Sequence, residues 1–442
     1  MSDRRLLRVL GLRHLIAYGM VLISPLAPVG IFGLAGKISH GHVTTAILVG
    51  MVAMMLTAAS YGRMASVYPS AGSAYTYVSR SVNPHLGFLA GWAMILDYLI
   101  IPIINVAYVA LTLERLLPTV PYAIWATAIA TLVTLLNLRS VKVTARANEI
   151  LLAVMFVVVA AFVFLAVRHL SGTSHLFSWK PLYNPATFRL GDLATATSLA
   201  ALTYIGFDGV TTLAEETVNP GRVMPLATVL VCAITGILSA VEVYLAQMVW
   251  PDFNGFHNLE TAFLDVCARV GGTLLFQIVG AILVLASFGS ALGGQAAAAR
   301  LLFSMGRDGV LPKRVFGTIS AATATPVRNT LLVGALAWAG ALWISWQRAV
   351  EMLNFGAFLA FMGVNVAALC YFYWPASKFH LSMLLPLFGF VFCLGIWLSL
   401  PLPAKIAGGS WFLVGLIYSA IRTRGFRQRP AVLRFDDSPS EA

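Results

Sequence analysis

The sequence predicts an all-α integral membrane protein with about twelve transmembrane helices. Two observations carry this prediction. The 442 residues are 59% hydrophobic and only 10% charged, a composition outside the range of water-soluble domains. Apolar stretches of about 20 residues, the length that a helix needs to cross a bilayer, follow one another along nearly the whole chain. The short polar and basic breaks between them leave no room for a soluble domain.

The predicted spans occupy, in order, residues 13–37, 43–67, 85–113, 119–137, 147–168, 191–216, 225–250, 273–304, 328–346, 350–374, 380–399 and 404–422. The first span follows a basic start but lacks a small-residue cleavage site. We therefore expect it to stay in the protein as a membrane helix and not to be a removed signal peptide.

Charge predicts the orientation of the spans. Most of the 29 lysines and arginines fall in the two tails and in alternate loops, and the positive-inside rule places that side in the cytoplasm. An even number of spans then puts both termini inside. The formal net charge of +12 thus indicates orientation and attraction to anionic lipid, and it is not a nucleic-acid footprint.

Two predicted spans carry helix-breaking residues near their centres: "SPLAPVG" over residues 24–30 in the first, and "GFDG" over residues 206–209 in the sixth. Interrupted helices at corresponding positions of two halves indicate the substrate site of a transporter. Unwound backbone at membrane depth is tolerated only where it faces protein or a watered cavity. The alternative is that proline and glycine merely kink these helices.

Several longer stretches carry a family resemblance. "GFDGVTTLAEETVNPGRVMP" (206–225) resembles the sixth-helix signature of the amino acid, polyamine and organocation transporters. "SMGRDGVLP" (304–312) is similar to the loop after their eighth helix, and "YPSAGSAYTYVSR" (68–80) to the loop between their second and third. Within that family, "GHV", "SAYTY", "LDYL" and "NFGA" look like the bacterial putrescine importers. The resemblance covers nearly the whole chain.

The resemblance implies a LeuT-type fold of five plus five inverted repeats with broken helices 1 and 6. The transport core would span 13–374, with peripheral helices 11 and 12 over 375–422 and cytoplasmic tails at 1–12 and 423–442. It also implies import of a putrescine-like amine across the inner membrane by alternating access. An amino acid permease of the same superfamily is the alternative, and a membrane sensor or channel on this scaffold is a more distant one.

The first break offers main-chain groups to a substrate. The candidates are Ser24, Leu26, Ala27, Val29 and Gly30. Amino acid carriers of the family usually have a Gly-Ser-Gly break whose free N–H groups hold the substrate carboxylate. Here two prolines, which have no N–H to donate, interrupt the same region. A substrate without a carboxylate fits this better, although the remaining N–H groups could still serve one.

Three carboxylates lie inside predicted spans: Asp97, Asp208 and Glu242. An ionised side chain at the centre of a membrane helix costs about 2.5–3.5 kcal/mol on insertion scales, so such residues are functional candidates. No lysine or arginine sits comparably deep, which favours a cation or a proton as the partner. The alternatives are a helix cap for Asp208, a hydrogen bond to a neighbouring helix for Asp97, and a vestibule for Glu242.

Two carboxylates could each hold one ammonium group of a diamine through charge-assisted hydrogen bonds. Aromatic faces could add cation–π contacts. The candidate aromatic residues are Trp92, Tyr98, Tyr204 and Phe207, and Gly206 and Gly209 complete the predicted binding segment of the sixth span.

Glu215 and Glu216 lie where the sixth span reaches the cytoplasm. We expect them to secure a gate or loop by pairing with a basic neighbour such as Arg63 or Arg222. A solvated face is the alternative.

Proton coupling through Asp208 or Asp97 is the expected energy source, because burial disfavours the charged form of a carboxyl group. The fifth span lacks the lysine that several proton-coupled relatives place there. Ser287 and Ser290 are weak sodium candidates, since serines in membrane helices usually bond to their own backbone. His40 and His42 could sense external pH, with a solvated loop as the simpler interpretation.

No enzyme, cofactor or metal site is expected. The sequence offers no catalytic nucleophile or phosphate-binding loop, and the four cysteines show neither metal-ligand spacing nor a paired pattern: Cys232, Cys267, Cys370 and Cys393. The predicted partners are a small amine or amino acid, a proton and the lipid bilayer.

Overall fold

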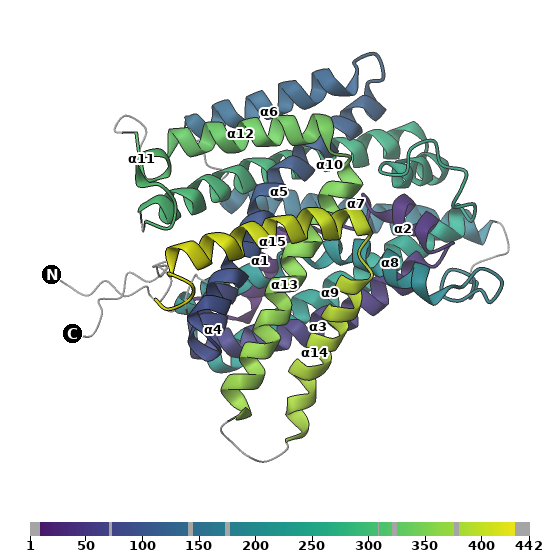
Figure 1. The fold of residues 1–442 in the computed structure, drawn as a ribbon. Helices are drawn as coiled ribbons and strands as arrows, with labels where there is room; N and C mark the ends of the chain where they lie inside the picture. The colour runs from purple at the N-terminus through teal and green to yellow at the C-terminus, as the bar shows by residue number, and fades with distance from the viewer. Residues whose placement is uncertain are drawn as a thin grey trace.

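The structure, a computed structural model, describes residues 9–69, 73–139, 145–172, 177–307, 309–320, 325–374 and 380–428. The side chains of residues 145–148, 215 and 304 lie outside that description. The described residues form helices and loops, with one isolated parallel β-bridge between Leu10 and Thr217. Nine helical stretches are long and apolar enough to cross a membrane (Figure 1). The prediction of an all-helical membrane protein is confirmed at this level.

The first half of the chain contains α1 (Leu12–Ile23), α2 (Phe32–Ile38), α3 (Val43–Val67), α4 (Ser73–Ser81), α5 (Pro84–Leu116), α6 (Tyr122–Leu138) and α7 (Ala145–Ser171). The second half contains α8 (Leu190–Ala200), the 3-10 helices η1 (Ala201–Tyr204) and η2 (Phe207–Glu216), α9 (Pro220–Val249), α10 (Ala262–Arg307), α11 (Lys313–Phe316), α12 (Val327–Trp343), α13 (Trp346–Phe372), η4 (Leu381–Met383), α14 (Leu384–Leu398) and α15 (Leu402–Arg422).

Hydropathy located most helices closely, and the second span coincides with α3. The eighth predicted span, 273–304, starts directly after Gly272, whose φ of 66° interrupts α10, and hydropathy did not predict the helical segment that precedes this glycine. It also missed α4, because that helix is too short and too polar to register as a span.

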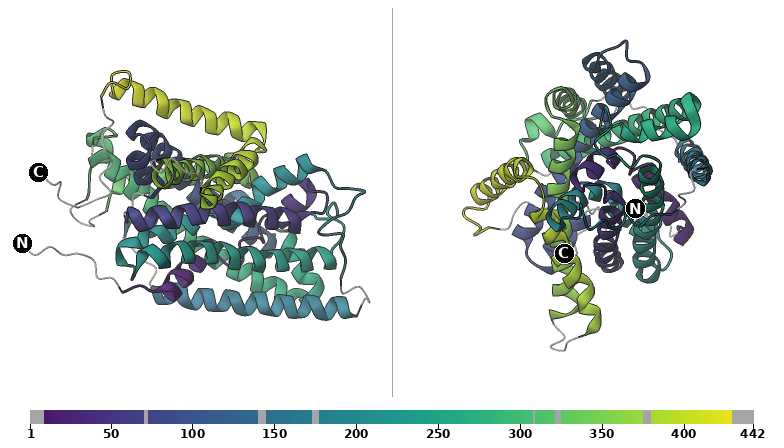
Figure 2. Two further views of the ribbon diagram at one scale, coloured as in Figure 1. Left: turned by 90° about the horizontal axis from the view of Figure 1, so that it is seen from below. Right: turned by 90° about the vertical axis from the view of Figure 1, so that its right-hand side faces the viewer.

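Helix α5 lies at the centre of the bundle and contacts α4, α6, α10, α12, α13 and α15. Helix α9 runs beside α3 and also touches α1, α7 and η2. Many helices of the bundle run in roughly the same direction and appear end-on in the right-hand view of Figure 2, whereas α13 and α14 run across them (Figure 1). Exposed apolar side chains such as Val157 and Phe164 on α7 face outward, as expected for lipid contact.

Helix α1 begins and α15 ends at the same end of the bundle (Figure 2). Helix α2 and the loop before α8 lie at the opposite end (Figure 1). The chain therefore presents two distinct ends, one with the starts of α1 and α9 and the other with the α2–α3 corner.

Candidate functional site

The two predicted breaks lie against each other. Helix α1 stops at Ile23, and Ser24 takes a positive φ of 71° before the chain turns into α2. In the other break, Gly206 has a φ of 118°. A Cβ atom added at Gly206 would lie 3.4 Å from Ile23, and one at Gly209 would lie 2.7 Å from a methyl group of Leu22. Glycine at both positions thus allows the second break to touch the end of α1.

The second break is longer than "GFDG" alone predicts. The backbone changes to 3-10 geometry at Ala201 and keeps it through Glu216, with an extended residue at Ile205 between η1 and η2. Runs of 3-10 helix longer than three or four residues are uncommon and often mark a functional hinge. The second half of the sixth span, residues 201–216, therefore lacks α-helical hydrogen bonding over its whole length.

The first break uses most of its own donors. The N–H of Leu26 donates to Ser24 Oγ at 3.3 Å, that of Ala27 to the Ser24 carbonyl at 3.1 Å, and that of Val29 to the Leu26 carbonyl at 3.2 Å. Gly30 packs against Tyr108 and Trp346, where a Cβ atom would lie 3.1–3.2 Å from the rings. In this conformation three of the five candidate N–H groups are committed within the break, and a fourth, that of Ser24, donates to the Met20 carbonyl of α1.

Two of the three predicted carboxylates lie in the same region of the bundle. Asp97 is on α5, near Asp208 in the first turn of η2. The backbone N–H groups of residues 206, 208 and 209 lie beside the Asp208 carboxylate, so helix capping and ligand contact are both open to this residue. The Asp97 Oδ1 atom is buried and has no hydrogen-bond partner within the described part of the chain.

Three tyrosines lie near Asp208: Tyr61, Tyr77 and Tyr98. Tyr61 and Tyr77 are completely buried, and their hydroxyl groups have no hydrogen-bond partner among the described residues. The sequence analysis identified only Tyr98. Tyr61 lies in the last third of α3, and Tyr77 belongs to the "SAYTY" motif on α4.

Aromatic rings close one side of the site. The rings of Tyr61 and Phe207 meet edge to face with centroids 5.3 Å apart, and Phe361 of α13 lies 5.7 Å from Tyr61 and 5.2 Å from Phe207. Such a cluster can present both ring faces and hydroxyl groups to a cation.

Two other predicted aromatic residues serve different roles. Trp92 stacks on Trp411 of α15 with centroids 5.0 Å apart and donates to its carbonyl, so it anchors a peripheral helix. The Tyr204 hydroxyl donates to the carbonyl of Ile47 at 2.7 Å and fixes η1 to α3. The sequence could not separate these structural rings from those at the break, because the separation depends on which helices meet.

Residues 14–421 match the sequence profile of the family described as amino acid permease. The chain belongs to the amino acid permease family. It is 33% identical to the low-affinity putrescine importer PlaP of Escherichia coli, over 96% of each chain. It is 26% identical to the branched-chain amino acid permease BcaP of Lactococcus lactis, again over 96% of each. It is 30% identical to the vacuolar cationic amino acid transporter 4 of Arabidopsis thaliana, over 80% of this chain and 62% of that one.

The family and its relatives identify this permease as a transporter with several membrane-spanning helices, and the bacterial relatives support a location in the inner membrane.

Arg63 and Glu216, which the sequence predicts to secure a gate or loop, both have described contacts. Arg63 donates to the Tyr373 hydroxyl at 2.6 Å and lies 4.2 Å over the Phe372 ring, so its described contacts tie α3 to α13. The main-chain carbonyl of Glu216 accepts from Val9 and Leu10 at 2.9 Å, which attaches the N-terminal segment to the end of η2. The Glu215 side chain lies outside the described residues.

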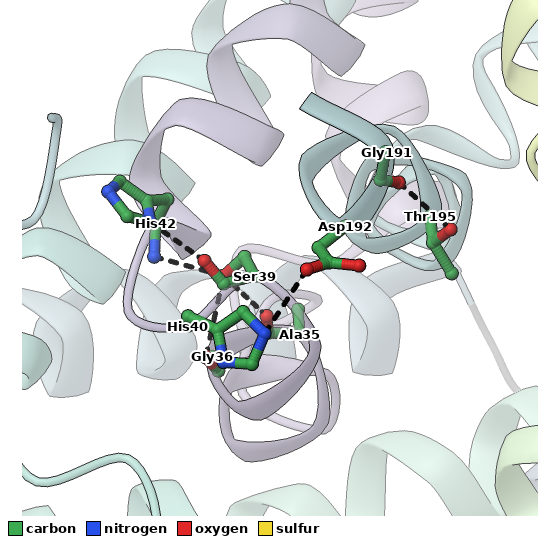
Figure 3. A network of polar contacts seen from close by, with 8 residues as sticks. All are labelled: Ala35, Gly36, Ser39, His40, His42, Gly191, Asp192 and Thr195. Atoms are coloured by element: carbon green, nitrogen blue, oxygen red, sulfur yellow. Dashed lines mark hydrogen bonds and ion pairs between the residues drawn. The ribbon is translucent and has the colours of Figure 1, made fainter. Parts of the chain in front are cut away.

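At the other end of the permease, His40 Nε2 lies 3.2 Å from a carboxylate oxygen of Asp192 on α8 (Figure 3). His42 is 1% exposed, so the expectation of a solvated loop is wrong for this residue. Its Nδ1 lies 2.7 Å from the Ser39 carbonyl, and its Nε2 accepts from the Asn184 N–H at 3.0 Å. Because a carbonyl only accepts and an N–H only donates, this geometry requires the neutral ring with its proton on Nδ1.

The remaining candidates lie on α9 and α10. Glu242 is buried in α9, apart from the pair at the break. Of the two sodium candidates on α10, Ser287 is half-buried and Ser290 is exposed.

Proposed function

We propose that this permease imports a small diamine of the putrescine class across the bacterial inner membrane by alternating access, coupled to proton entry. The observation that carries the proposal is the presence of two carboxylates near each other at the broken sixth span: Asp208 lies in the first turn of η2, and Asp97 has a buried Oδ1 atom without a hydrogen-bond partner among the described residues. Among the described residues, no lysine, arginine or histidine forms an ion pair with either carboxylate. Two neighbouring carboxylates without a resident cation suit a ligand with two ammonium groups.

The N–H groups of the first break, which are already hydrogen-bonded, also favour a substrate without a carboxylate. A substrate carboxylate would have to displace the internal bonds of Ala27 and Val29, whereas an ammonium group needs none of these donors. The rings of Tyr61, Phe207 and Phe361 suit a cation. The relative PlaP is a putrescine importer, and putrescine is a diamine with two ammonium groups.

A neutral amino acid is the second candidate, favoured by the likeness to BcaP. Its carboxylate would occupy the first break after rearrangement of that segment, and its single ammonium group would leave one of the two carboxylates unpaired. This difference makes the two candidates separable by a single pair of substitutions.

The proposal includes the finer architecture. The α1–α2 unit and the α8–η2 unit would be equivalent broken helices of two inverted repeats, within a set of twelve spans that leaves both termini in the cytoplasm. The adjoining breaks support this arrangement.

Uptake of labelled putrescine into proteoliposomes with an inward proton gradient tests the function. We expect saturable uptake that unlabelled leucine does not compete away. Replacing Asp208 by Asn removes a charged hydrogen bond worth about 2 kcal/mol, so the apparent affinity should fall about 30-fold. Asp97→Asn should act in the same direction.

The matched control is Glu351→Gln, an acid buried in α13 and bonded to Gln347 away from the break. Its uptake should equal that of the unmodified protein. Uptake of leucine that is indifferent to putrescine and to Asp97→Asn would replace the diamine by the amino acid candidate.

A further inference from the structure

Glu242 is a buried acid to which the described residues offer no hydrogen bond. It is 0% exposed on α9, and neither carboxylate oxygen has a hydrogen-bond partner within the described residues. A charged carboxylate with no bonds at membrane depth would cost several kcal/mol. The surroundings therefore suit the neutral acid, which holds a proton.

Among the described residues, the elements packed against α9 place no counter-charge beside Glu242. These elements are α1, α3, α7, η1, η2 and α10. The titratable group that faces Glu242 from them is the thiol of Cys267 on α10. No lysine, arginine or histidine of these elements interacts with Glu242 in the part of the chain that the structure describes.

A polar face of α9 links Glu242 to the break. Cys232, Thr235, Ser239 and Glu242 are spaced by three, four and three residues, which places them on one side of a helix. All four are at most 1% exposed. The Cys232 thiol interacts with the Asp208 charge, and the Thr235 hydroxyl lies 3.6 Å from the sulfur of Met20 on α1. Cys232 and Glu242 are ten residues apart along the helix, a distance of about 15 Å.

The other end of this polar face points toward the outer half of the bundle. Cys267 interacts with Tyr108, and Tyr108 interacts with Glu260 in the loop before α10. Tyr108 also lies against Gly30 at the end of the first break. Glu242 thus sits between the outer side of the first break and the carboxylate pair.

We propose that Glu242 is the proton-binding residue of coupled import, separate from the carboxylates that hold the substrate. This inference rests on the proposed function. If Asp208 or Asp97 carried the proton, an arriving diamine would displace it, and the protein would exchange one for the other. A separate acid allows the amine and the proton to be bound at the same time, as symport requires. The step is a proton transfer to and from a Glu242 carboxylate oxygen, with no other bond changed.

The test compares the unmodified permease with Glu242→Gln, which fixes the neutral form. The membrane potential is clamped at zero and the lumen carries a pH dye. A gradient of one pH unit sustains about tenfold accumulation through one co-transported proton. We expect Glu242→Gln to lose this accumulation and the acidification of the lumen on putrescine addition, while exchange of labelled for unlabelled putrescine at equal pH persists. Glu351→Gln should keep all three.

Gradient-driven accumulation by Glu242→Gln at the unmodified level would overturn the inference. A second measurement, infrared spectroscopy of the protein without substrate, does not depend on transport. The carbonyl band of the protonated Glu242 side chain should be present in the unmodified protein and lost in Glu242→Gln. Absence of that difference would also overturn it. If the unmodified permease moved no putrescine, the proposed function would fail, and the infrared difference would still decide the protonation of Glu242.

Discussion

At the scale of single residues, the contact between the two breaks depends on the absence of side chains. Gly206 combines a φ of 118° with close approach to Leu22 and Ile23, and Gly209 lies directly under a Leu22 methyl group. Any side chain at these positions would strain the backbone or push α1 away from η2.

Gly206→Ala should therefore destabilise the protein by about 1–2 kcal/mol, because alanine is strained at this φ. The measurement is thermal unfolding of the purified protein in detergent, with a lower midpoint expected. Gly409→Ala on α15 is the control, since its Cβ atom would meet nothing within 4 Å. An equal shift in both variants would contradict the argument.

The tyrosine hydroxyls around Asp208 give a second prediction at this scale. The Tyr61 hydroxyl is buried without a partner among the described residues, so its removal in Tyr61→Phe relieves a desolvation cost of about 1 kcal/mol in the substrate-free protein. We expect a higher unfolding midpoint without putrescine and a smaller rise on adding it. A lower midpoint in the substrate-free protein would show that the hydroxyl already has a partner.

At the scale of elements, the His42 ring is one of the contacts that tie the α2–α3 corner to the loop before α8. His42 Nε2 accepts the Asn184 N–H while Nδ1 donates to the Ser39 carbonyl. Without the ring, the Asn184 N–H would lose this acceptor.

His42→Phe should speed hydrogen exchange of the Asn184 amide, because the substitution removes the ring nitrogen that accepts its N–H. Exchange monitored by mass spectrometry of the peptide around residue 184 measures this. Equal exchange of this peptide in both proteins would contradict the role of the ring.

The elements also show what hydropathy can locate. Spans are set by local composition, so α3, α13 and α15 were placed closely. The 3-10 form of η1 and η2 was not predicted, because its residues are as apolar as those of an α-helix and the geometry depends on contacts with α1 and α3. Of the site, the carboxylates could be read from their cost in the membrane. Tyr61, Tyr77 and Phe361 could not, since only packing brings α3, α4 and α13 to the break.

At the scale of the whole molecule, α1 begins and α15 ends at one end of the bundle (Figure 2). Because basic residues concentrate toward this end, it should face the cytoplasm. A green fluorescent protein fused after residue 442 should then fluoresce in bacterial cells, whereas alkaline phosphatase fused there should be inactive. The opposite result would invert the orientation.

Helix η2 has a further consequence for the molecule as a whole. Ten residues of 3-10 helix measure about 20 Å, and the same residues as an α-helix measure about 15 Å. The segment is therefore about 5 Å longer, between Asp208 at its start and the Leu10–Thr217 bridge at its end, than the same residues would be as an α-helix. If it changed to α geometry, it would shorten and move the bridge and the start of α1 toward the bilayer centre. The N-terminal segment would follow this change because Val9 and Leu10 donate to the Glu216 carbonyl at the end of η2.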